Sequence, residues 1–529
     1  MELLMTNSRL QFRRAPATNC LMLGAACALL AGCNVGPKYV PPKATAPQVY
    51  KESPDQAKPI GDEPASTWKV ADPQDATLKG KWWEIYNEPD LNALEEQLNV
   101  DNQNIREAFE NFMEARSLVR EARSQFFPTI STGPSYSRSQ TSGNIGGGQS
   151  TVGTGSTGTT TTGSSGQQSQ TFSLPGEVSW APDLWQKVRN QVRSSQYQAQ
   201  VSAADLANER LTEQASLAEY FFEIRGQDAL QSILDAAVDA DKKSLAAEQG
   251  RYDTGVDDEI SLVEAKTQLS AAQSSAINNH LARAQYEHAI ATLIGKPAGD
   301  FSIPVLAKTS APPPIPVGLP SQLLERRPDV AAAERNMASA NAQIGVAYAA
   351  YYPTLTLSGS GGFESSTIGK LLDASSRFWS AGPSISETIY DGGLRRATVN
   401  QYIATYNGDL AAYRQTVLTA LQQVEDSLSS VRILSQQLQR QQEAVDNSKR
   451  YLELEQGRYD TGIDPYIDLA SAQDTLYGNQ EGLASLQIQQ MTASVTLIQA
   501  LGGGWDTSQL PTPAAITAKP SHADTKIQH

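Results

Sequence analysis

The string EQGRYDTG occurs twice in this chain of 529 residues, at 248–255 and again at 455–462. Because the two copies have a fixed offset of 207 (455 minus 248), the chain is an internal duplication, and its length reflects one architecture built twice. Each copy sits in long helical surroundings and ends in Asp-Thr-Gly, a combination typical of a turn. A duplicated turn of this kind indicates a repeated docking tip rather than an active site.

Long stretches without proline surround both copies, at 183–296 and 397–456. In the second stretch, apolar residues from Ile403 to Leu438 recur mostly at alternating intervals of three and four, as in a coiled-coil seam. A helix of sixty-odd residues would be roughly 90 Å long. Each long helix ends at the repeated turn, and a second helix returns over 258–293 and 465–501. The pattern therefore predicts two long antiparallel helical hairpins.

Extended segments precede each long helix. QFFPTI at 125–130 and AYYPTL at 350–355 place aromatic residues beside a proline, which ends a helix and begins an extended run. The alternation that follows is the weak pattern of membrane β-strands. Strands of a soluble sandwich fit this alternation equally well, but nothing else in the chain could form the second sheet of a sandwich. We therefore predict four membrane strands in two hairpins.

The first repeat contains an insertion. The matching prolines at 128 and 353 have an offset of 225 (353 minus 128), which exceeds the offset of 207 between the tips by 18 (225 minus 207). The extra length falls in residues 141–168, which carry no charge and almost no apolar side chain. We expect this segment to be a mobile, exposed loop between two strands rather than an interdomain linker.

The N-terminus combines basic residues, an apolar run and LAGC ending at Cys33, the pattern of a secretory signal followed by a lipobox. Cleavage before Cys33 would leave it as an acylated N-terminus, sufficient for stable anchoring. The alternative is an ordinary signal peptide. The other cysteines, Cys20 and Cys27, lie in the removed segment, so the mature chain can form no internal disulfide. The remaining 39 basic and 56 acidic residues give a net charge of −17, which argues against nucleic-acid binding.

These patterns divide the chain into six segments. We predict a signal peptide at 1–32, a lipid-anchored extended segment at 33–83, a first structural repeat at 84–310, a Pro-rich linker at 311–320, a second repeat at 321–505 and a disordered C-terminal tail at 506–529. After Cys33 no apolar run reaches the 18 or more residues of a membrane-spanning helix.

The predicted strands require several copies of the chain. Four strands cannot close a barrel, and an open sheet edge in hydrocarbon leaves backbone groups without hydrogen bonds. Eight, twelve or sixteen strands would correspond to a dimer, a trimer or a tetramer.

Five further motifs accompany the two RYDTG tips: CNVGPKY at 33–39, LPSQLLERRPDV at 319–330, ANAQIG at 340–345, IYDGG at 389–393 and LGGGW at 501–505. In this order they resemble the TolC-type outer membrane factors, particularly the OprM/NodT branch of outer membrane efflux lipoproteins, over nearly all of residues 33–505. The resemblance implies a mainly α fold with a small membrane β-region, in which each protomer has long helical hairpins and four transmembrane strands. It further implies a homotrimer with a twelve-stranded barrel and a twelve-helix periplasmic tunnel, lipid-anchored in the cell outer membrane.

The resemblance also assigns the two turns. In this family they form the periplasmic end, closed at rest, where a membrane-fusion adaptor docks. A helix stop alone would explain Asp-Thr-Gly but not the shared Arg-Tyr. The docking residues implied are Arg251, Tyr252, Thr254, Gly255 and Val256 in the first tip, and Arg458, Tyr459, Thr461, Gly462 and Ile463 in the second.

A periplasmic gate is implied just beyond the second tip. Matching by the tip motif puts Ile467 on an apolar constriction and Ser471 on a position where the OprM branch has an aspartate, so an acidic ring at Ser471 is in doubt. Asp468 matches an aspartate of TolC itself, while Ile260 and Glu264 are the first-repeat counterparts of Ile467 and Ser471. The alternative for each carboxylate is a solvated helix face. We expect the second tip to form the tighter constriction.

The predicted function is the exit duct of a tripartite efflux pump, passively conducting small molecules such as drugs outward. Its partners would be a periplasmic adaptor, an inner-membrane pump of the resistance-nodulation-division type and outer membrane lipid. Metal-ion efflux, type I protein secretion and a structural lipid-anchored coiled-coil surface protein are the alternatives. An enzyme is disfavoured, because His280, His288, His522 and His529 form no metal motif and no nucleotide-binding fingerprint stands out. We expect no cofactor.

Overall fold

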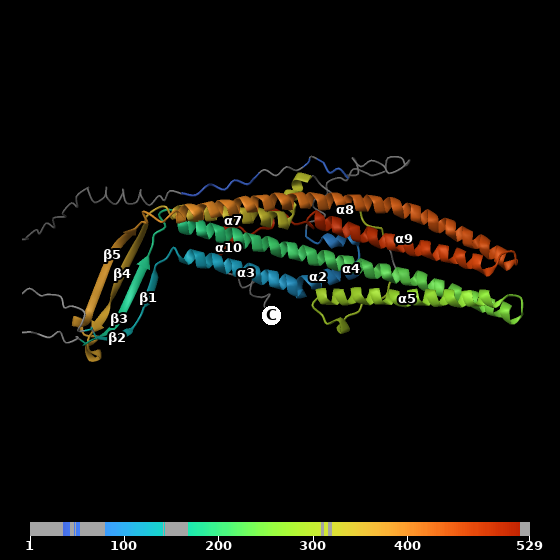
Figure 1. Ribbon diagram of the computed structural model, residues 1–529, viewed down its shortest axis with the longest axis horizontal. Coiled ribbons are helices and arrows are strands. Elements are labelled where there is room, and N and C mark those ends of the chain that lie inside the picture. Colours follow the sequence, from blue (N-terminus) through green and yellow to red (C-terminus); the bar gives the residue numbers. More distant parts are fainter. Residues whose placement is uncertain are drawn as a thin grey trace, which may run out of the picture. The chain divides into compact units, whose positions relative to one another are not determined.

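The computed structural model describes residues 35–42, 47, 49–52, 80–140, 142, 168–307, 311–315 and 320–518 (Figure 1). The predicted signal peptide, the lipidation site Cys33 and almost all of the loop 141–168 lie outside the described residues. The chain divides into two compact units. One contains residues 119–195 and 340–405 with the N-terminal residues to 39, and the other contains 40–118, 196–339 and 406–529. The division falls within α3, α4, α7 and α8, whose bounds are given below.

Two helical hairpins confirm the duplication at the level of single residues. In the first, α4 (Lys187–Asp253) is followed by α5 (Glu259–Leu293). In the second, α8 (Leu394–Asp460) is followed by α9 (Tyr466–Ala500). Each bound of the second pair has the same offset of 207 from the matching bound of the first, as in 394 minus 187. The register deduced from one eight-residue string thus holds along both hairpins.

The shorter helices follow the other predicted offset. The first repeat opens with α2 (Pro89–Asp101) and α3 (Gln103–Ser124), and the second has α7 (Pro328–Ala349). Both bounds of α7 are offset by 225 from those of α3, as in 328 minus 103. The change from 225 to 207 therefore occurs between these helices and the long ones, where the insertion is predicted. The remaining short helices are η1 (Trp82–Tyr86), η2 (Ala298–Asp300), η3 (Pro320–Gln322), α6 (Leu323–Arg326), η4 (Ile368–Lys370), η5 (Ala374–Ser376), η6 (Thr507–Gln509) and α10 (Pro513–Thr517).

One antiparallel sheet lies in the first unit (Figure 1). It contains β1 (Thr129–Thr132), β2 (Ser135–Gln140), β3 (Gln168–Trp180), β4 (Thr354–Ser365) and β5 (Arg377–Ser386). Because β1 and β2 follow each other along β3, the sheet is four strands wide, as predicted. The two repeats join where β3 pairs with β4. The strands β2 and β3 pair up to Gln140 and Gln168, so residues 141–167 connect two hydrogen-bonded strand ends.

The aromatic-proline segments mark helix-to-strand joints, as predicted. In the first repeat α3 ends before the Phe-Phe-Pro segment and the Trp180 indole donates a hydrogen bond to the Phe126 carbonyl at 2.9 Å. In the second repeat the Trp185 indole donates to the Pro353 carbonyl at 2.8 Å and its ring stacks on Tyr352. Both joints are thus fixed by a tryptophan that follows or ends β3.

A large hydrophobic core in the second unit is built from η1, α2, α4, α5 and α9. Its fully buried members include Trp82, Leu91, Phe221, Ile290 and Ile498. Burial of each such side chain contributes on the order of 1.5–3 kcal/mol. This core therefore anchors the helices of both repeats to one another.

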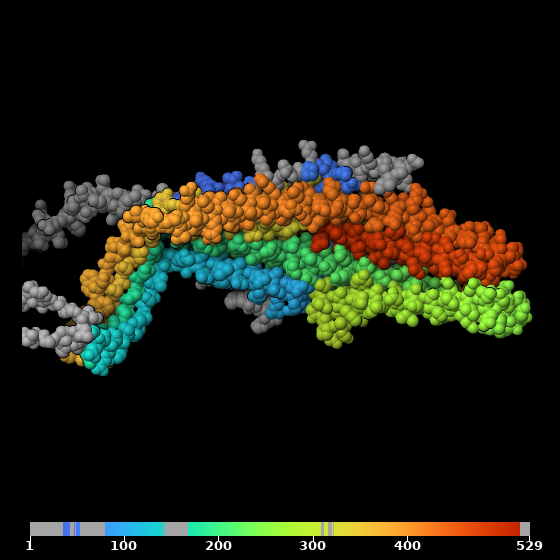
Figure 2. Space-filling view, in the orientation of Figure 1, coloured from blue at the N-terminus to red at the C-terminus, as the bar shows by residue number. Residues whose placement is uncertain are grey.

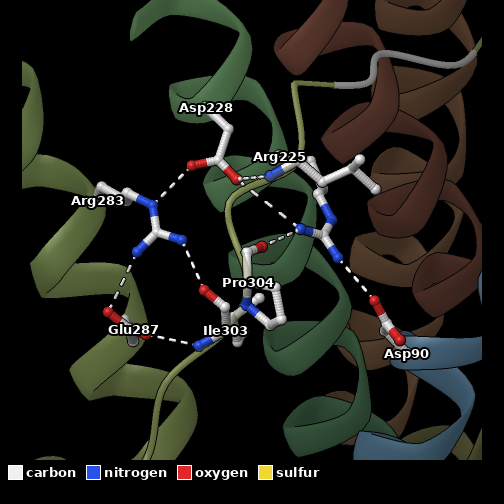
Figure 3. Close-up of polar contacts among 8 residues, drawn as sticks. Asp90, Arg225, Asp228, Arg283, Glu287, Ile303 and Pro304 are labelled. Atoms are coloured by element: carbon white, nitrogen blue, oxygen red, sulfur yellow. Dashed lines mark hydrogen bonds and ion pairs between the residues drawn. The ribbon is translucent and has the colours of Figure 1, made fainter.

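A buried ionic network fixes the segment that follows α5 (Figure 3). Asp228 on α4 accepts from Arg283 at 2.6 Å and from the Leu306 amide at 2.9 Å. Arg225 donates to the Pro304 carbonyl at 2.8 Å and pairs with Asp90 at 2.8 Å. Because each buried charge has an opposite charge or a backbone partner, this polar cluster is tolerated inside the protein.

Two of the motifs that carried the family resemblance meet in the structure. The Arg327 guanidinium donates to the Ala500 carbonyl at 3.0 Å and pairs with Asp329. Gly502 has φ +94°, and a Cβ placed there would lie 2.0 Å from the Arg326 carbonyl oxygen. Only glycine therefore fits at this contact.

The predicted disordered tail is wrong for residues 506–518. These residues contain η6 and α10, and Ile516 is only 1 % exposed. Arg116 on α3 donates to the carbonyls of Ile516 and Ala518 at 3.4 and 3.2 Å. A single buried isoleucine anchors a segment whose overall composition is polar, and composition alone conceals this. Residues 519–529 lie outside the described residues.

Candidate functional site

The first predicted tip is a helix end closed by a glycine in the left-handed region. Gly255 has φ +71°, its amide donates to the Tyr252 carbonyl at 3.0 Å, and the Val256 amide donates to the Arg251 carbonyl at 2.9 Å. This pair of bonds is the Schellman motif. The Thr254 hydroxyl donates back to the Gly250 carbonyl at 2.9 Å.

The second tip repeats this geometry. Gly462 has φ +73°, its amide donates to the Tyr459 carbonyl at 2.9 Å, and the Ile463 amide donates to the Arg458 carbonyl at 2.9 Å. The Thr461 hydroxyl donates to the Gly457 carbonyl at 3.0 Å. The helix-stop interpretation thus accounts for the repeated Thr-Gly, and it leaves the repeated Arg-Tyr to be explained.

The two tyrosines of the repeated string have different surroundings. Tyr459 is 8 % exposed, whereas Tyr252 is 42 % exposed. The Tyr459 hydroxyl donates to the Glu248 carboxylate of the first repeat. The Arg251 guanidinium lies 4.9 Å above the Tyr459 ring, a cation–π contact. The structure therefore joins the two predicted tips through Tyr459, and Figure 1 shows both turns at the same end of their unit.

Burial and the neighbouring carboxylate raise the pKa of the tyrosine in this contact. Burial, and next the hydrogen bond to Glu248, raise the pKa of Tyr459 to about 12. Burial also raises the pKa of Glu248. Tyr466, at the start of α9, packs edge-on against Tyr459 with ring centroids 6.3 Å apart. The tip contact is therefore a protonated tyrosine held against a buried carboxylate.

The helices leave the two tips in different ways. At the start of α5, the Asp258 carboxylate accepts from the Ile260 and Ser261 amides at 3.0 and 3.3 Å, an N-cap. At the start of α9, Pro465 takes the cap position and no side chain supplies a capping bond. Instead the Arg458 guanidinium holds Asp464 with a bond of 2.8 Å, and this hydrogen bond lowers the pKa of Asp464.

Most of the other predicted docking residues are accessible. The exposed ones are Thr254, Gly255, Val256, Arg458, Thr461, Gly462 and Ile463, and Arg251 is half-buried. The two tips thus present matching turns whose backbone and short side chains face outward. An open groove of about 570 Å³ lies beside them, lined by Ser244, Lys243, Gln456, Tyr459 and Tyr477 among others.

The predicted gate residues lie one or two turns beyond the tips. Ile260 and Ile467 are both exposed, as are Asp468 and Ser471, and Glu264 is half-buried. Two carboxylates close to them were not predicted from the sequence. Asp241 on α4 is buried, and its pKa is raised to about 6 by burial and by Asp474 on α9. Asp474 also accepts a hydrogen bond from Gln268 on α5.

The contact made by Glu248 was not predicted either, although the sequence carried a signal for this residue. Glu248 and Glu455 are the first residues of the two repeated strings, so their identity was part of the motif. No sequence pattern showed that Glu248 would meet a tyrosine of the other repeat.

Comparison with known families decides the class of protein. The family model described as outer membrane efflux protein matches residues 94–296 and 319–503. The chain belongs to this family. The solvent efflux pump outer membrane protein SrpC of Pseudomonas putida is 29 % identical over 94 % of this chain and 100 % of its own length. The pyoverdine export outer membrane protein OpmQ of Pseudomonas aeruginosa is 27 % identical over 92 % of this chain and 98 % of its own length.

A solved structure agrees with these relatives. The structure of the outer-membrane channel OprN has 27 % sequence identity and a TM-score of 0.75, and the match covers 89 % of this chain and 100 % of that one. The protein is therefore an outer membrane efflux channel that extends into the periplasm, and the predicted family, fold class and location are confirmed. In the part of the chain that the structure describes, no helix is both long and apolar enough to cross a membrane.

Proposed function

We propose that three copies of this chain form the exit duct of a tripartite efflux pump, through which small molecules pass outward without catalysis. The observation that carries this proposal is the pair of matching, accessible helix turns at one end of a helical unit, in a chain whose other unit carries a four-stranded sheet. A turn repeated so closely suits a ring in which both tips meet the same kind of partner.

The sheet supports assembly from several copies. Its outer strands are β1 with β2 on one side and β5 on the other, and neither pairs further within the described residues. Exposed strand edges in a membrane protein require a partner strand. Three copies would supply twelve strands, the number that the family resemblance implies.

The tips are the proposed docking site of a periplasmic adaptor. Val256 and Ile463 supply an apolar side chain at each turn, and Arg458 supplies a charge beside the second. The adaptor would connect the duct to an inner-membrane pump of the resistance-nodulation-division type. Acylation of Cys33 would hold the N-terminal segment at outer membrane lipid.

The gate is proposed at Ile260, Ile467, Asp468, Ser471 and Glu264. Ile260 and Ile467 occupy the same position in the two repeats, and both side chains are exposed. A pair of side chains left uncovered in both repeats suits a surface that faces a central passage rather than a neighbouring helix. Three copies of Asp468 around such a passage would favour cations.

Planar lipid bilayers test the duct itself. We expect the purified oligomer to conduct ions weakly, and a variant with Arg458→Ala and Tyr459→Phe to conduct more, because the substitutions remove the ion pair to Asp464 and the hydrogen bond to Glu248. If both forms leave the bilayer impermeable, the chain is better explained as a coiled-coil surface fibre.

Single-channel recordings test the gate. Asp468→Ala should reduce the cation selectivity of the opened variant, and Ser471→Asp should increase it, since the two substitutions change the charge of the mouth in opposite directions. Unchanged conductance and selectivity in Asp468→Ala would remove this residue from the gate.

A further inference from the structure

The two faces of the sheet differ in chemistry. Successive side chains of a strand alternate between faces and directly paired residues share one, so the strand pairing assigns every residue to a face. One face, called the apolar face, carries all the exposed large hydrophobic side chains of the described strands, namely Ile130, Tyr136, Val178, Trp180, Leu357, Trp379 and Ile385. The opposite face, called the hydroxyl face, is mainly serine and threonine, with Phe378 as an aromatic exception.

Side-chain contacts agree with this assignment. On the apolar face the rings of Tyr136 and Phe172 lie 4.6 Å apart between centroids. On the hydroxyl face the Ser139 and Ser169 hydroxyl oxygens lie 2.8 Å apart. Figure 2 shows the orange surface of the second-repeat strands directly beside the teal surface of the first-repeat strands, so the faces continue from one repeat into the other.

The charged residues of the strands are divided between the two faces by sign. The described strands contain four of them, Arg138, Glu177, Glu364 and Arg377. Each glutamate pairs with serine residues, and both lie on the hydroxyl face. Both arginines lie on the apolar face, and the Arg377 guanidinium is 5.9 Å from the centroid of the Phe363 ring. The apolar face therefore carries positive charge only.

The position of Arg138 is at one edge of the apolar band. Trp180 ends β3 beside the helix joint, where its indole donates to the Phe126 carbonyl. From Trp180 to Phe172 the apolar face extends for roughly 26 Å along the strand, comparable with the apolar band of a membrane barrel, which is about 25 Å tall. Beyond Phe172 this face continues with Gln170, the partner of Arg138. Arg138 thus lies just past the band, on the side away from the joint.

Arg377 approaches the same edge of the band. It is the first residue of β5, and its partner Phe363 pairs in turn with Leu174, one position of the apolar face below Phe172. A long arginine side chain can cover apolar surface with its stem while its charge reaches the polar boundary. Because the helical part of the protein extends into the periplasm, the edge that carries both arginines faces the outside of the cell.

Neither arginine has an anionic partner in the part of the chain that the structure describes. Arg138 donates to the Gln168 side-chain carbonyl at 3.0 Å, and Arg377 makes the cation–π contact with Phe363. Cations left without carboxylates on an apolar face, in a chain with a net charge of −15, indicate an anion from outside the chain. At the boundary of a membrane such anions are lipid headgroups, and the planar guanidinium binds phosphate oxygens in pairs.

We propose that Arg138 and Arg377 bind phosphate groups of the lipid in the outward-facing leaflet of the outer membrane. The inference rests on the proposed function, which places the sheet in the membrane, and it adds a lipid contact far from the acylation site at Cys33. The two arginines are three strand spacings apart, roughly 14 Å across the sheet, so each meets its own phosphate. The lipid is one with phosphate monoesters, which carry about −1.5 to −2 charges at pH 7.

Titration with lipid A tests the site. The full-length protein in detergent is titrated in mixed micelles with lipid A carrying two phosphates, and with the same lipid after dephosphorylation. Microscale thermophoresis gives the two dissociation constants. We expect the wild type to bind the phosphorylated lipid at least about tenfold more tightly, because charge-assisted hydrogen bonds are made only to that form. The variant with Arg138→Gln and Arg377→Gln should lose this preference.

Charge changes on the opposite face provide the matched control. Glu177→Gln with Glu364→Gln alters two strand residues on the hydroxyl face and should leave the phosphate preference unchanged. Arg138→Lys with Arg377→Lys keeps both charges and should keep part of the preference, which separates loss of charge from loss of structure. Size-exclusion chromatography checks that every variant retains the oligomer of the wild type.

Three results would overturn the site. These are no phosphate preference in the wild type, an equal preference in the double arginine-to-glutamine variant, and an equal loss in the glutamate control. Phosphatidylglycerol, a phosphate diester, is added as a competitor. Competition as strong as that of phosphorylated lipid A would overturn the assignment to a lipid with phosphate monoesters.

The titration also separates this inference from the proposed function. Conductance in bilayers by a protein without phosphate preference would leave the duct in place and overturn the lipid site. A preference that depends on both arginines, in a protein that leaves bilayers impermeable, would support the lipid site and count against the duct.

Discussion

Single glycines fix where chain segments can approach each other. A Cβ placed on Gly226 of α4 would lie 2.1 Å from Cγ1 of Ile488 on α9. A Cβ on Gly36 would lie 2.6 Å from the Cα of Gly345 on α7, so the N-terminal segment crosses that helix in direct backbone contact. At both positions the absence of a side chain sets the distance between two elements.

We expect Gly226→Val to destabilise the protein, because the added atoms overlap the Ile488 side chain. Overpacking of this kind costs about 1–3 kcal/mol. The measurement is the apparent melting temperature in detergent, followed by the helical circular dichroism signal at one scan rate. Gly408→Ala on α8 is the control, since no atom lies within 4 Å of a Cβ there. A melting temperature for Gly226→Val equal to that of the control would contradict the close contact.

At the scale of elements, the packing of α4 on α9 brings acidic groups together. Asp241 on α4 is buried and faces Asp474, Tyr466 and Tyr477 of α9, with Gln268 of α5 bonded to Asp474. Burial also raises the pKa of Asp474. Two carboxyl groups between helices hold protons more tightly than they would in water.

This arrangement predicts that stability falls as pH rises. The pKa of Asp241 is about 6 in the folded protein and about 3.9 when unfolded, so the folded state binds the proton more tightly. The stabilisation is complete below about pH 4 and is lost as pH rises through about 6. We expect Asp241→Asn to flatten the decline and to raise the melting temperature at pH 7, by up to about 3 kcal/mol of stability per chain.

Melting curves between about pH 4 and pH 7 check this expectation. Asp239→Asn, an exposed position on the same helix, is the matched control. A decline of equal slope in wild type and Asp241→Asn would show that other groups govern the pH dependence.

At the scale of the whole molecule, the two repeats share their long helices but not their strand connections. In the second repeat, residues 366–376 connect β4 to β5. In the first, residues 141–167 connect β2 to β3. Since both connections close a hairpin in the same sheet, the longer one is not needed to form it.

We therefore expect that replacing residues 141–167 with Asn-Gly leaves assembly and conductance unchanged, because Asn-Gly closes a two-residue hairpin between the paired residues Gln140 and Gln168. Size-exclusion chromatography with light scattering and bilayer recordings provide the measurement. Loss of the oligomer would mean that the longer connection contributes to assembly.

Several features could be predicted from the sequence because they depend on local patterns. The period of apolar residues and the absence of proline defined the long helices, and the Asp-Thr-Gly turns defined their ends within a few residues. The two different offsets of the repeat placed the insertion between Gln140 and Gln168, where β2 and β3 pair. The ordered residues around Ile516 were missed, because one buried side chain changes no compositional average.

The sequence by itself determined that EQGRYDTG marks one structural point in two repeats, because both copies carry the same local turn chemistry. Only the tertiary structure decided that the two copies are unequal. Tyr459 reaches Glu248 and is buried, while Tyr252 stays exposed, since α9 packs on α4 and no described residues cover α5 in the same way. Identical local sequences thus acquire different surroundings, because burial depends on contacts between residues far apart in the chain.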